Sequence, residues 1–336
     1  MSDTAPGQPV RVRVRVPATS ANLGPGFDSL GLALSRHDVV EAWTTDSGLS
    51  IEVTGEGAGT AGEGEAHLVV KAMRQTFEIL DGQPSGLALR CMNRIPHARG
   101  LGSSAAAIVS GVLAARALTE GGPQRLPDQA VLRLAAGLEG HPDNVAACLL
   151  GGLTVAWTEA GQSHAVRLSP LRAIVPAVIV APQPLSTRTA RGVLPDVVPH
   201  ADAATNAGRS ALLIAALTSD TASDPGPLLA ATQDRLHQPY RAGVMPETAR
   251  LVQSLRDAGV PAVVSGAGPS VLAFLVRPGA AGAPGPASPN GLDSIVRDMG
   301  IGWDISVLDV DRRGASIQLV TPDEKGGPVP AGGTLP

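Results

Sequence analysis

Hydrophobic and polar positions along this chain alternate in some stretches and follow helical spacing in others. Residues 10–16 alternate valine with arginine, which predicts a strand with one buried face. Short apolar runs predict further strands at 30–34, 39–43, 49–53, 87–91, 153–157, 175–181, 262–264, 271–276, 303–310 and 315–320. Apolar residues at helical spacing predict helices at 67–80, 105–118, 129–138, 203–217, 227–236, 245–258 and 292–299. Strands and helices are therefore mixed along the chain, and their order alone does not single out one fold.

The composition limits the classes of protein that this chain can form. Its 336 residues suit two domains or one large one, and 43% hydrophobic residues are enough for a sizeable core. Aromatic residues make up only 2%, so aliphatic side chains must build that core. A net charge of −4 and few rings for base stacking argue against nucleic acid as a partner. The Pro- and Gly-containing stretches 1–9 and 322–336 are predicted to be flexible tails.

The two cysteines and the N-terminus predict the compartment. Cys91 and Cys148 lie far apart in apolar runs, which predicts two buried free thiols in a reducing environment. The N-terminus has no apolar segment of the kind a signal peptide needs. No apolar run reaches membrane length without Gly, Pro or a charged residue. We therefore predict a soluble cytoplasmic protein without a membrane partner.

The stretch 96–107, which reads PHARGLGSSAAA, has the chemistry of a phosphate-binding loop. Gly100 and Gly102 allow the backbone to approach a ligand closely, and Ser103 and Ser104 fall at the start of the helix that follows. A helix N-terminus directs unpaired N–H groups and a positive dipole end at an anion. The stretch lacks the Lys of a Walker A motif and the spacing of a dinucleotide fingerprint. A tight turn with an ordinary serine cap is the alternative reading.

Other stretches place polar residues beside apolar runs. Residues 17–28, PATSANLGPGFD, predict a rigid loop in which Asn22 and Asp28 either hold a ligand or cap turns. Residues 139–144, EGHPDN, concentrate polar groups at a helix end. We interpret Glu139, Asp143 and Asn144 as candidates for chemistry and His141 as a turn residue. Residues 186–191 open a helix whose Arg191 suits a carboxylate or phosphate clamp, or a solvated surface. Residues 265–270, SGAGPS, predict at least a hairpin turn.

In their order and separations, the stretches 17–28, 96–107 and 265–270 resemble the motifs of the GHMP small-molecule kinases, and EGHPDN followed by VAACLLGG supports the resemblance. It extends from about Val12 to Val320. It implies an α+β fold of two domains. The N-terminal ATP-binding domain, 10–160, would resemble domain 2 of ribosomal protein S5, and the C-terminal domain, 161–321, would be ferredoxin-like. The active site would lie between them.

Within the family, the motif forms are most similar to members that phosphorylate L-homoserine to O-phospho-L-homoserine, a step in threonine biosynthesis. The resemblance implies ATP and Mg²⁺, with the metal on Ser104 and Glu139. The implied ATP-binding residues are Pro96, His97, Ala98, Arg99, Gly100, Leu101, Gly102, Ser103, Ser104, Ala105 and Ala106. The implied substrate-binding residues are Asn22, Asp28, Asn144, Thr187, Arg191 and Arg241.

The implied reaction is phosphoryl transfer, in which catalysis is mostly positioning and electrostatic stabilisation. The catalytic candidates are Asn144, Asp143 and Arg191, with Asp143 either a base or a structural residue. Alternative interpretations are a kinase for a sugar or mevalonate-type alcohol, a non-catalytic ATP-binding regulator, or a structural or nucleic-acid-binding protein. Relatives often have Asn where this chain has His67, so base selectivity stays open. Relatives are commonly homodimers, which is the expected assembly.

Overall fold

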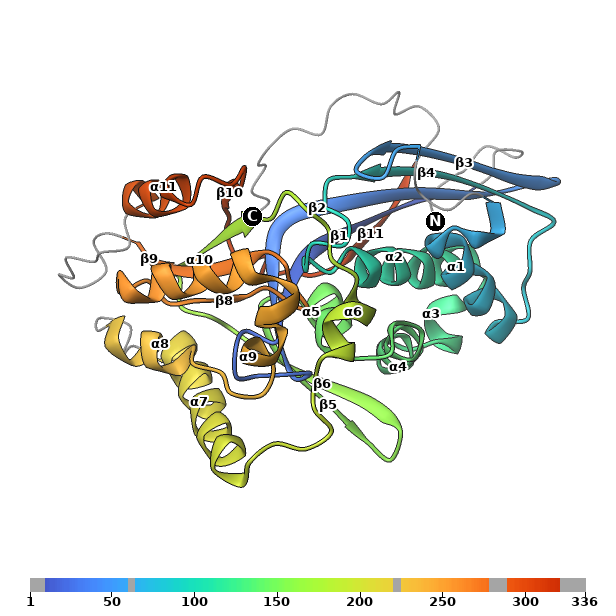
Figure 1. Cartoon of the computed structure of the whole chain (residues 1–336). Coiled ribbons are helices and arrows are strands. Elements are labelled where there is room, and N and C mark those ends of the chain that lie inside the picture. Colours follow the sequence, from blue (N-terminus) through green and yellow to red (C-terminus); the bar gives the residue numbers. More distant parts are fainter. Residues whose placement is uncertain (1–9, 60–63, 220–224, 278–288, 321–336) are drawn as a thin grey trace.

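The computed structural model describes residues 10–59, 64–219, 225–277 and 289–320. Its larger sheet has seven strands and extends from β3 and β4, at the upper right of Figure 1, down to β5 and β6. Five of them follow the order β11-β1-β2-β4-β3, and a hairpin of β5 and β6 extends from β2. The strands are β1 (Arg11–Ala21), β2 (Leu30–Thr45), β3 (Gly48–Gly55), β4 (Gly86–Asn93), β5 (Leu153–Glu159), β6 (Gln162–Leu168) and β11 (Ser316–Val320). The predicted tails 1–9 and 322–336 lie outside the described residues.

Strand β1 follows the valine–arginine alternation and is longer than predicted. Its valines are fully buried, while Arg13 reaches Glu41 on β2 at 2.8 Å. The expectation that residues 17–28 form a loop from their first residue is wrong, because β1 continues to Ala21. Small side chains at 18–21 allow pairing with 31–34, and a bulge between Pro17 and Ala18 absorbs the change of register. The two strands predicted at 30–34 and 39–43 are accordingly one strand, β2.

Helices cover one face of this sheet (Figure 1), and their apolar side chains pack against those of the strands in the larger core cluster. They are η1 (Gly64–Ala66), α1 (Leu68–Ile79), α2 (Ser103–Leu118), α3 (Gly122–Arg125), α4 (Asp128–Glu139) and α5 (Asp143–Leu150). Helix α2 is central, and Gly111 lets α1 pass close to it, because a Cβ there would lie 2.5 Å from the Val69 carbonyl oxygen. The α5 helix begins at Asp143, so the last two residues of the polar EGHPDN stretch form the first turn of this helix.

The second sheet has four antiparallel strands in the order β10-β7-β9-β8. They are β7 (Ile174–Val180), β8 (Ala262–Val264), β9 (Val271–Val276) and β10 (Asp304–Val307). The remaining elements are α6 (Thr187–Gly192), α7 (His200–Thr218), α8 (Pro225–Ala231), α9 (Gln238–Arg241), η3 (Ala242–Val244), α10 (Pro246–Asp257) and α11 (Pro289–Asp298). Leucines of α10 and α11 pack on this sheet in a second core cluster. The predicted hairpin at 265–270 is confirmed, since Val264 pairs with Val271.

Three further differences from the predicted elements have local causes. The β6 strand was not predicted, because its side chains are only partly buried and its pattern is weakly apolar. The helix predicted at 227–236 ends at Ala231, where the chain turns through polar residues instead. The strand predicted at 303–310 is only Asp304–Val307. Within the described ranges, no helix is long and apolar enough to cross a membrane.

Strand pairing links the two ends of the chain. β6 and β11 come from beyond residue 160, yet both belong to the larger sheet, with Ile317 of β11 opposite Val14 of β1. The domain bounds 10–160 and 161–321 therefore remain a prediction along the sequence, while the sheets divide the strands differently. Cys91 and Cys148 are free and buried, as predicted, and burial raises the pKa of the Cys91 thiol to about 12.

Asp311 holds the segment before β11 against β1 and β2. Its carboxylate lies 2.5 Å from His37 Nε2 and accepts the N–H groups of Arg313 and Gly314 at 2.8 Å. Arg15 contacts His37 Nδ1 at 2.9 Å, and because a guanidinium only donates, the His37 proton lies on Nε2. Burial opposes the charge, but these hydrogen bonds lower the pKa of Asp311 below its ordinary 3.8.

Replacing Asp311 with Asn is expected to lower the free energy of unfolding by about 1–3 kcal/mol at pH 7, because buried N–H donors lose a charged acceptor. A depressed folded-state pKa contributes stability above the unfolded-state pKa and loses it as the pH falls through the folded value. The difference between wild type and Asp311→Asn should therefore shrink below about pH 4. Urea unfolding between pH 3 and 8 measures it, and a difference that grows in acid would contradict this role.

Candidate active site

The loop before α2 has the conformation of a phosphate cradle. Gly102 is the N-cap of α2 with φ of +70° and offers no side chain to the first-turn N–H groups. Ser103 and Ser104 form the first turn, as expected from the sequence. These N–H groups and the helix dipole point out of the helix end, where an anion can satisfy them. The local geometry therefore fits the phosphates of a nucleotide.

Close packing explains the glycines of this loop. A Cβ on Gly100, whose φ is +71°, would lie 2.1 Å from the Ser265 carbonyl oxygen. A Cβ on Gly102 would lie 2.0 Å from Thr19 Oγ1. The Ser265 hydroxyl also donates to the Gly100 carbonyl at 2.7 Å, so the 265–270 turn and the end of β1 enclose the loop. SGAGPS thus forms part of the site as well as a hairpin.

A cavity of about 230 Å³ lies beside the loop and collects most of the predicted site residues. Its lining consists of Asn22, Ala98, Gly100, Leu101, Gly102, Ser103, Ser104, Glu139, His141, Asp143, Asn144, Thr187, Arg191, Arg241, Gly266 and Ala267. Asp28 reaches the lining through its ion pair with Arg191.

Five of the predicted ATP-binding residues do not line this cavity. Ala105 and Ala106 are fully buried within α2. The Arg99 guanidinium points away from the cavity and donates to the carbonyl groups of His97, Ala181 and Pro182. Pro96 and Arg99 line a separate surface cavity, and His97 lines another one. The ATP-binding role of this loop therefore stays a prediction, and only some of its residues line this cavity.

The Asn144 side chain is oriented by its neighbours. Thr19 Oγ1 donates to Asn144 Oδ1 at 2.8 Å in a buried contact, which leaves the Asn144 Nδ2 donor for the cavity. Asp143 is buried, accepts the Asn144 N–H at 2.8 Å, and lies 2.7 Å from His141 Nδ1. Burial tends to lower the pKa of His141, but the hydrogen bond to Asp143 and the Asp143 and Glu139 charges raise it overall. His141, expected to be a turn residue, thus lies in the site.

Replacing Thr19 with Val is expected to lower kcat about tenfold. Asn144 Oδ1 loses its buried hydrogen-bond donor, so the Asn144 amide is no longer held in one orientation. Valine keeps the shape of threonine, so stability should fall by only about 1 kcal/mol. Steady-state kinetics with saturating substrates measure the effect. Thr205→Val, on helix α7, is the matched control, since the Thr205 hydroxyl donates to the Ala201 carbonyl and to no other described residue. An unchanged kcat in Thr19→Val would contradict this orienting role.

Ser104 and Glu139 form the candidate metal contacts. The Ser104 hydroxyl donates to Glu139 Oε2 at 2.7 Å, and both line the cavity. Burial raises the pKa of the Glu139 carboxyl, although the Ser104 hydrogen bond opposes this. Hydroxyl and carboxylate oxygens suit a hard cation, and Mg²⁺ in such sites takes its other ligands from phosphate and water. Among the described residues, no group of three or more His, Cys, Asp or Glu side chains is arranged to hold a metal by itself.

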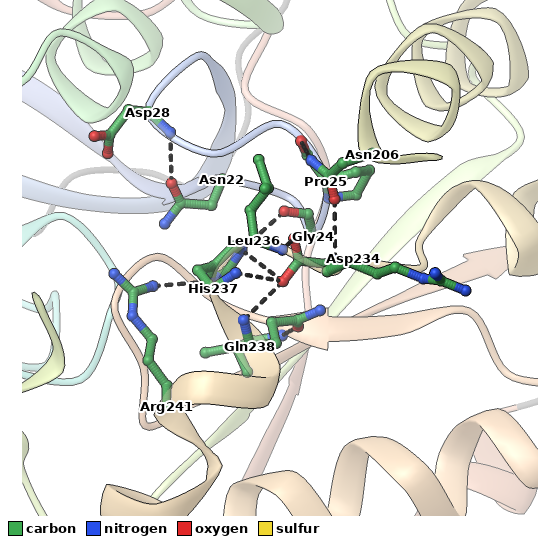
Figure 2. Close-up of polar contacts among 12 residues, drawn as sticks. Asn22, Gly24, Pro25, Asp28, Asn206, Asp234, Leu236, His237, Gln238 and Arg241 are labelled. Carbon is green, nitrogen blue, oxygen red and sulfur yellow. Dashed lines mark hydrogen bonds and ion pairs between the residues drawn. The ribbon is translucent and has the colours of Figure 1, made fainter. Parts of the chain in front are cut away.

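On the other side of the cavity lies a charged cluster. Arg191 binds Asp28 through both Nη atoms, at 2.6 and 3.1 Å. Arg241 is fully buried and forms no ion pair with a carboxylate of the described residues. Its Nε donates to the Ala190 carbonyl oxygen. Its Nη1 contacts His237 Nδ1, as Figure 2 shows. Burial first, and then the Arg191 charge, lower the pKa of Arg241 to about 10.

Sequence reasoning missed several residues that build the site. Thr19 lies within the PATSANLGPGFD stretch, so its position was the available signal. Asn206, Asp234 and His237 have buried side chains that hold the 22–28 loop and Arg241 (Figure 2). Isolated polar residues in helical or turn segments gave no local signal for this role.

A second cavity, of about 330 Å³, shares Ser103 and Ser104 with the first. It is lined by residues of β2, α1 and α2, including His67 and Ser110. His67 Nδ1 and Ser110 Oγ are buried without a hydrogen-bond partner. Burial, followed by the His97 charge, lowers the pKa of His67. Unpaired polar groups in a cavity that adjoins the phosphate loop are consistent with a place for the nucleotide base.

Comparisons with known proteins agree with this geometry. The GHMP kinases N terminal domain model matches residues 67–152, and the GHMP kinases C terminal model matches 213–283. A homoserine kinase of Streptomyces avermitilis is 54% identical over 306 residues, covering 91% of this chain and 95% of the relative. One from Clavibacter michiganensis is 48% identical, covering 92% and 95%. The crystal structure of homoserine kinase from Cytophaga hutchinsonii superposes with a TM-score of 0.79 at 27% identity, covering 95% and 100%.

The chain belongs to the GHMP kinase family, with its two-domain α+β fold. The fold extends across the family, since L. major mevalonate kinase superposes with a TM-score of 0.61 at 17% identity. The relatives similar in sequence over most of this chain are homoserine kinases, which agrees with the branch that its motifs indicate.

Proposed function

We propose that this chain transfers the γ-phosphoryl group of ATP to the hydroxyl group of L-homoserine, giving O-phospho-L-homoserine and ADP. One observation carries the proposal: a single cavity joins the N-terminus of α2 to a cluster of Asp28, Arg191 and Arg241. The helix end suits phosphate, and the cluster offers both charges that a small zwitterion needs. Homologues named homoserine kinase support the choice of acceptor, and threonine biosynthesis is the proposed context.

The carboxylate of homoserine is assigned to Arg241. A buried guanidinium without a carboxylate partner is costly, and an anionic ligand offsets that cost. Its described hydrogen bonds use Nε and Nη1, so Nη2 remains for the ligand. Asp28 is assigned to the ammonium group, with Arg191 shared between Asp28 and the ligand. Thr187 and Asn22 line the same cavity and complete the acceptor site.

Asn144 and the α2 N-terminus are assigned to the reacting groups. Asn144 Nδ2 would hold the acceptor hydroxyl, because Thr19 occupies Oδ1. N–H groups of the first turn of α2 would stabilise charge on the transferred oxygens. The Asp143 carboxylate contacts the Asn144 N–H and His141, which supports a positioning role rather than a base. An Asp143→Asn variant that retains kcat would support the base-free reaction.

Mg²⁺ is the proposed metal, and Ser104 and Glu139 would hold it. When bound, it would neutralise phosphate charge. Glu139→Gln is expected to raise the Mg²⁺ concentration for half-maximal activity about tenfold, because a carboxylate ligand is lost. A magnesium titration of the steady-state rate measures this, with Glu65→Gln, an exposed partner of Arg74, as control. An unchanged magnesium dependence would remove Glu139 from the metal site.

A coupled ADP-release assay tests the reaction. The acceptors are L-homoserine, L-threonine, mevalonate and galactose, each with ATP and Mg²⁺. Turnover with homoserine alone, lost in Asn144→Ala and Arg191→Ala, is the expected result. Turnover with another alcohol would support the kinase activity and contradict the assignment of homoserine as the phosphoryl acceptor. ATP binding without any turnover would favour a non-catalytic regulator on the same fold.

We also propose a cytoplasmic homodimer. Strand β11 is a sheet edge, and its Ile317 and Leu319 side chains are 40% and 71% exposed. Exposed apolar residues on a sheet edge suit pairing with a second copy. Light scattering after gel filtration tests the assembly, and a monomer across the micromolar range would refute it. The free buried cysteines support a reducing compartment.

A further inference from the structure

The 22–28 loop carries the predicted acceptor residues in a strained backbone. Asn22, Leu23 and Asp28 have positive φ angles of 65°, 49° and 54°, a region that non-glycine residues rarely adopt. Such strain persists only where the surroundings hold it. Asn206 Nδ2 donates to the Pro25 carbonyl oxygen at 2.6 Å, which is one of these restraints. His237, at the start of α9, supplies another.

His237 links this loop to Arg241, as Figure 2 shows. Its ring is fully buried, with Nε2 at 2.8 Å from the Gly24 carbonyl oxygen and Nδ1 at 2.9 Å from Arg241 Nη1. A carbonyl oxygen only accepts and a guanidinium only donates. The proton must therefore lie on Nε2, and the Nδ1 lone pair faces Arg241. The imidazole is neutral and has one defined tautomer.

The ring itself is fixed from several sides. The Asp234 carboxylate accepts the N–H groups of Leu236, His237 and Gln238 at 2.7 to 3.1 Å. Phe27 stacks on the imidazole with ring centroids 5.2 Å apart. Burial lowers the pKa of His237 despite the nearby Asp234 charge, which agrees with a neutral ring. The His237 Nδ1 atom that accepts the hydrogen bond from Arg241 is therefore held in one position.

We propose that His237 is a positioning residue for the acceptor carboxylate: its Nδ1 holds Arg241 Nη1, and its Nε2–H ties that arrangement to the Gly24 carbonyl of the loop bearing Asp28. The inference rests on the proposed function. Because His237 Nδ1 accepts a hydrogen bond from Arg241 Nη1, it fixes the plane of the guanidinium group. Nη2 can then donate to the ligand carboxylate in one orientation. His237 thereby sets the distance between Arg241, which binds the carboxylate of homoserine, and the loop of Asp28, which binds its ammonium group.

Two substitutions of His237 separate its two hydrogen bonds. In His237→Asn, the amide oxygen takes the place of Nδ1 and keeps an acceptor for Arg241, while the bond to Gly24 is lost. In His237→Gln, the amide nitrogen takes the place of Nε2 and keeps the donor to Gly24, while the acceptor for Arg241 is lost. Each variant loses one buried hydrogen bond, so the pair is matched in stability cost, which thermal unfolding checks.

The readout compares L-homoserine with 2-amino-1,4-butanediol, which keeps the amine and the terminal hydroxyl but has a neutral hydroxymethyl group in place of the carboxylate. His237→Gln is expected to raise KM for homoserine about tenfold and to change KM for the diol less than about twofold, because only the carboxylate uses Arg241. His237→Asn should leave KM for homoserine within about threefold of wild type. KM for ATP should stay unchanged in both variants.

The outcomes decide the proposal separately from the function. Equal losses for homoserine and the diol, or equal losses in both variants, would reduce His237 to a structural residue and overturn the proposal. A homoserine KM in His237→Gln equal to that of wild type would overturn it as well. Wild-type protein that does not turn over homoserine would instead refute the proposed function, whatever the His237 variants do.

Discussion

Arg241→Met is expected to lower kcat/KM for homoserine by a factor of about 10² to 10³, because removing one partner of a buried charge pair costs roughly 3–4 kcal/mol. Methionine fills much of the same volume without a charge. The loss should appear mainly in KM for homoserine, since Arg241 is assigned to the substrate carboxylate and not to the transferred group. KM for ATP should change little, because the described hydrogen bonds of Arg241 go to Ala190, His237 and Gly266 and not to the phosphate loop. Steady-state kinetics with each substrate varied in turn measure the three parameters.

Arg256→Met is the matched control for this variant. Arg256, on α10, is a partly buried arginine, whereas Arg241 is fully buried. The Arg256 guanidinium donates to Thr232 and the Leu229 carbonyl outside the site. Its replacement should alter stability without a selective effect on homoserine. If Arg241→Met and Arg256→Met change kcat/KM alike, the assignment of Arg241 to the carboxylate is wrong.

Gly102→Ala is expected to reduce kcat about 10²-fold or more, since a shift of reacting groups by about 1 Å has effects of that size. The new Cβ would lie 2.0 Å from Thr19 Oγ1 and 3.0 Å from Asn144 Oδ1, so both side chains must move. Its φ of +70° adds strain, and together these effects should lower stability by about 2–4 kcal/mol. Activity assays below the melting temperature and urea unfolding separate the two effects.

Gly137→Ala is the control for a glycine-to-alanine change. Gly137 lies on an exposed face of α4 with ordinary helical geometry, and a Cβ there would contact nothing within 4 Å. Alanine should stabilise this helix by about 0.5–1 kcal/mol and leave kcat unchanged. Wild-type activity in Gly102→Ala would show that the loop tolerates a side chain, contrary to the packing described above.

Much of the site could be predicted from the sequence because its parts are local. The phosphate loop depends on glycines and serines that are adjacent in the chain, and their backbone preferences act over a few residues. The alternation of β1 and the apolar spacing of α1 and α10 predicted those elements for the same reason. The continuation of β1 into residues 17–21 was missed, since Pro, Ser and Thr there are typical of loops unless a partner strand pairs with them.

By itself, the sequence determined the elements with strong periodicity, the family resemblance, and the segments that carry the site. Tertiary structure alone decided which atoms meet: Thr19 with Asn144, Asp28 with Arg191, and Gly24 with His237. These partners are 125, 163 and 213 residues apart in the chain. It also decided that β11 joins β1 and that Arg99 points away from the phosphate site. Local sterics set periodicity and turns, whereas packing of distant segments sets burial, tautomer and charge pairing.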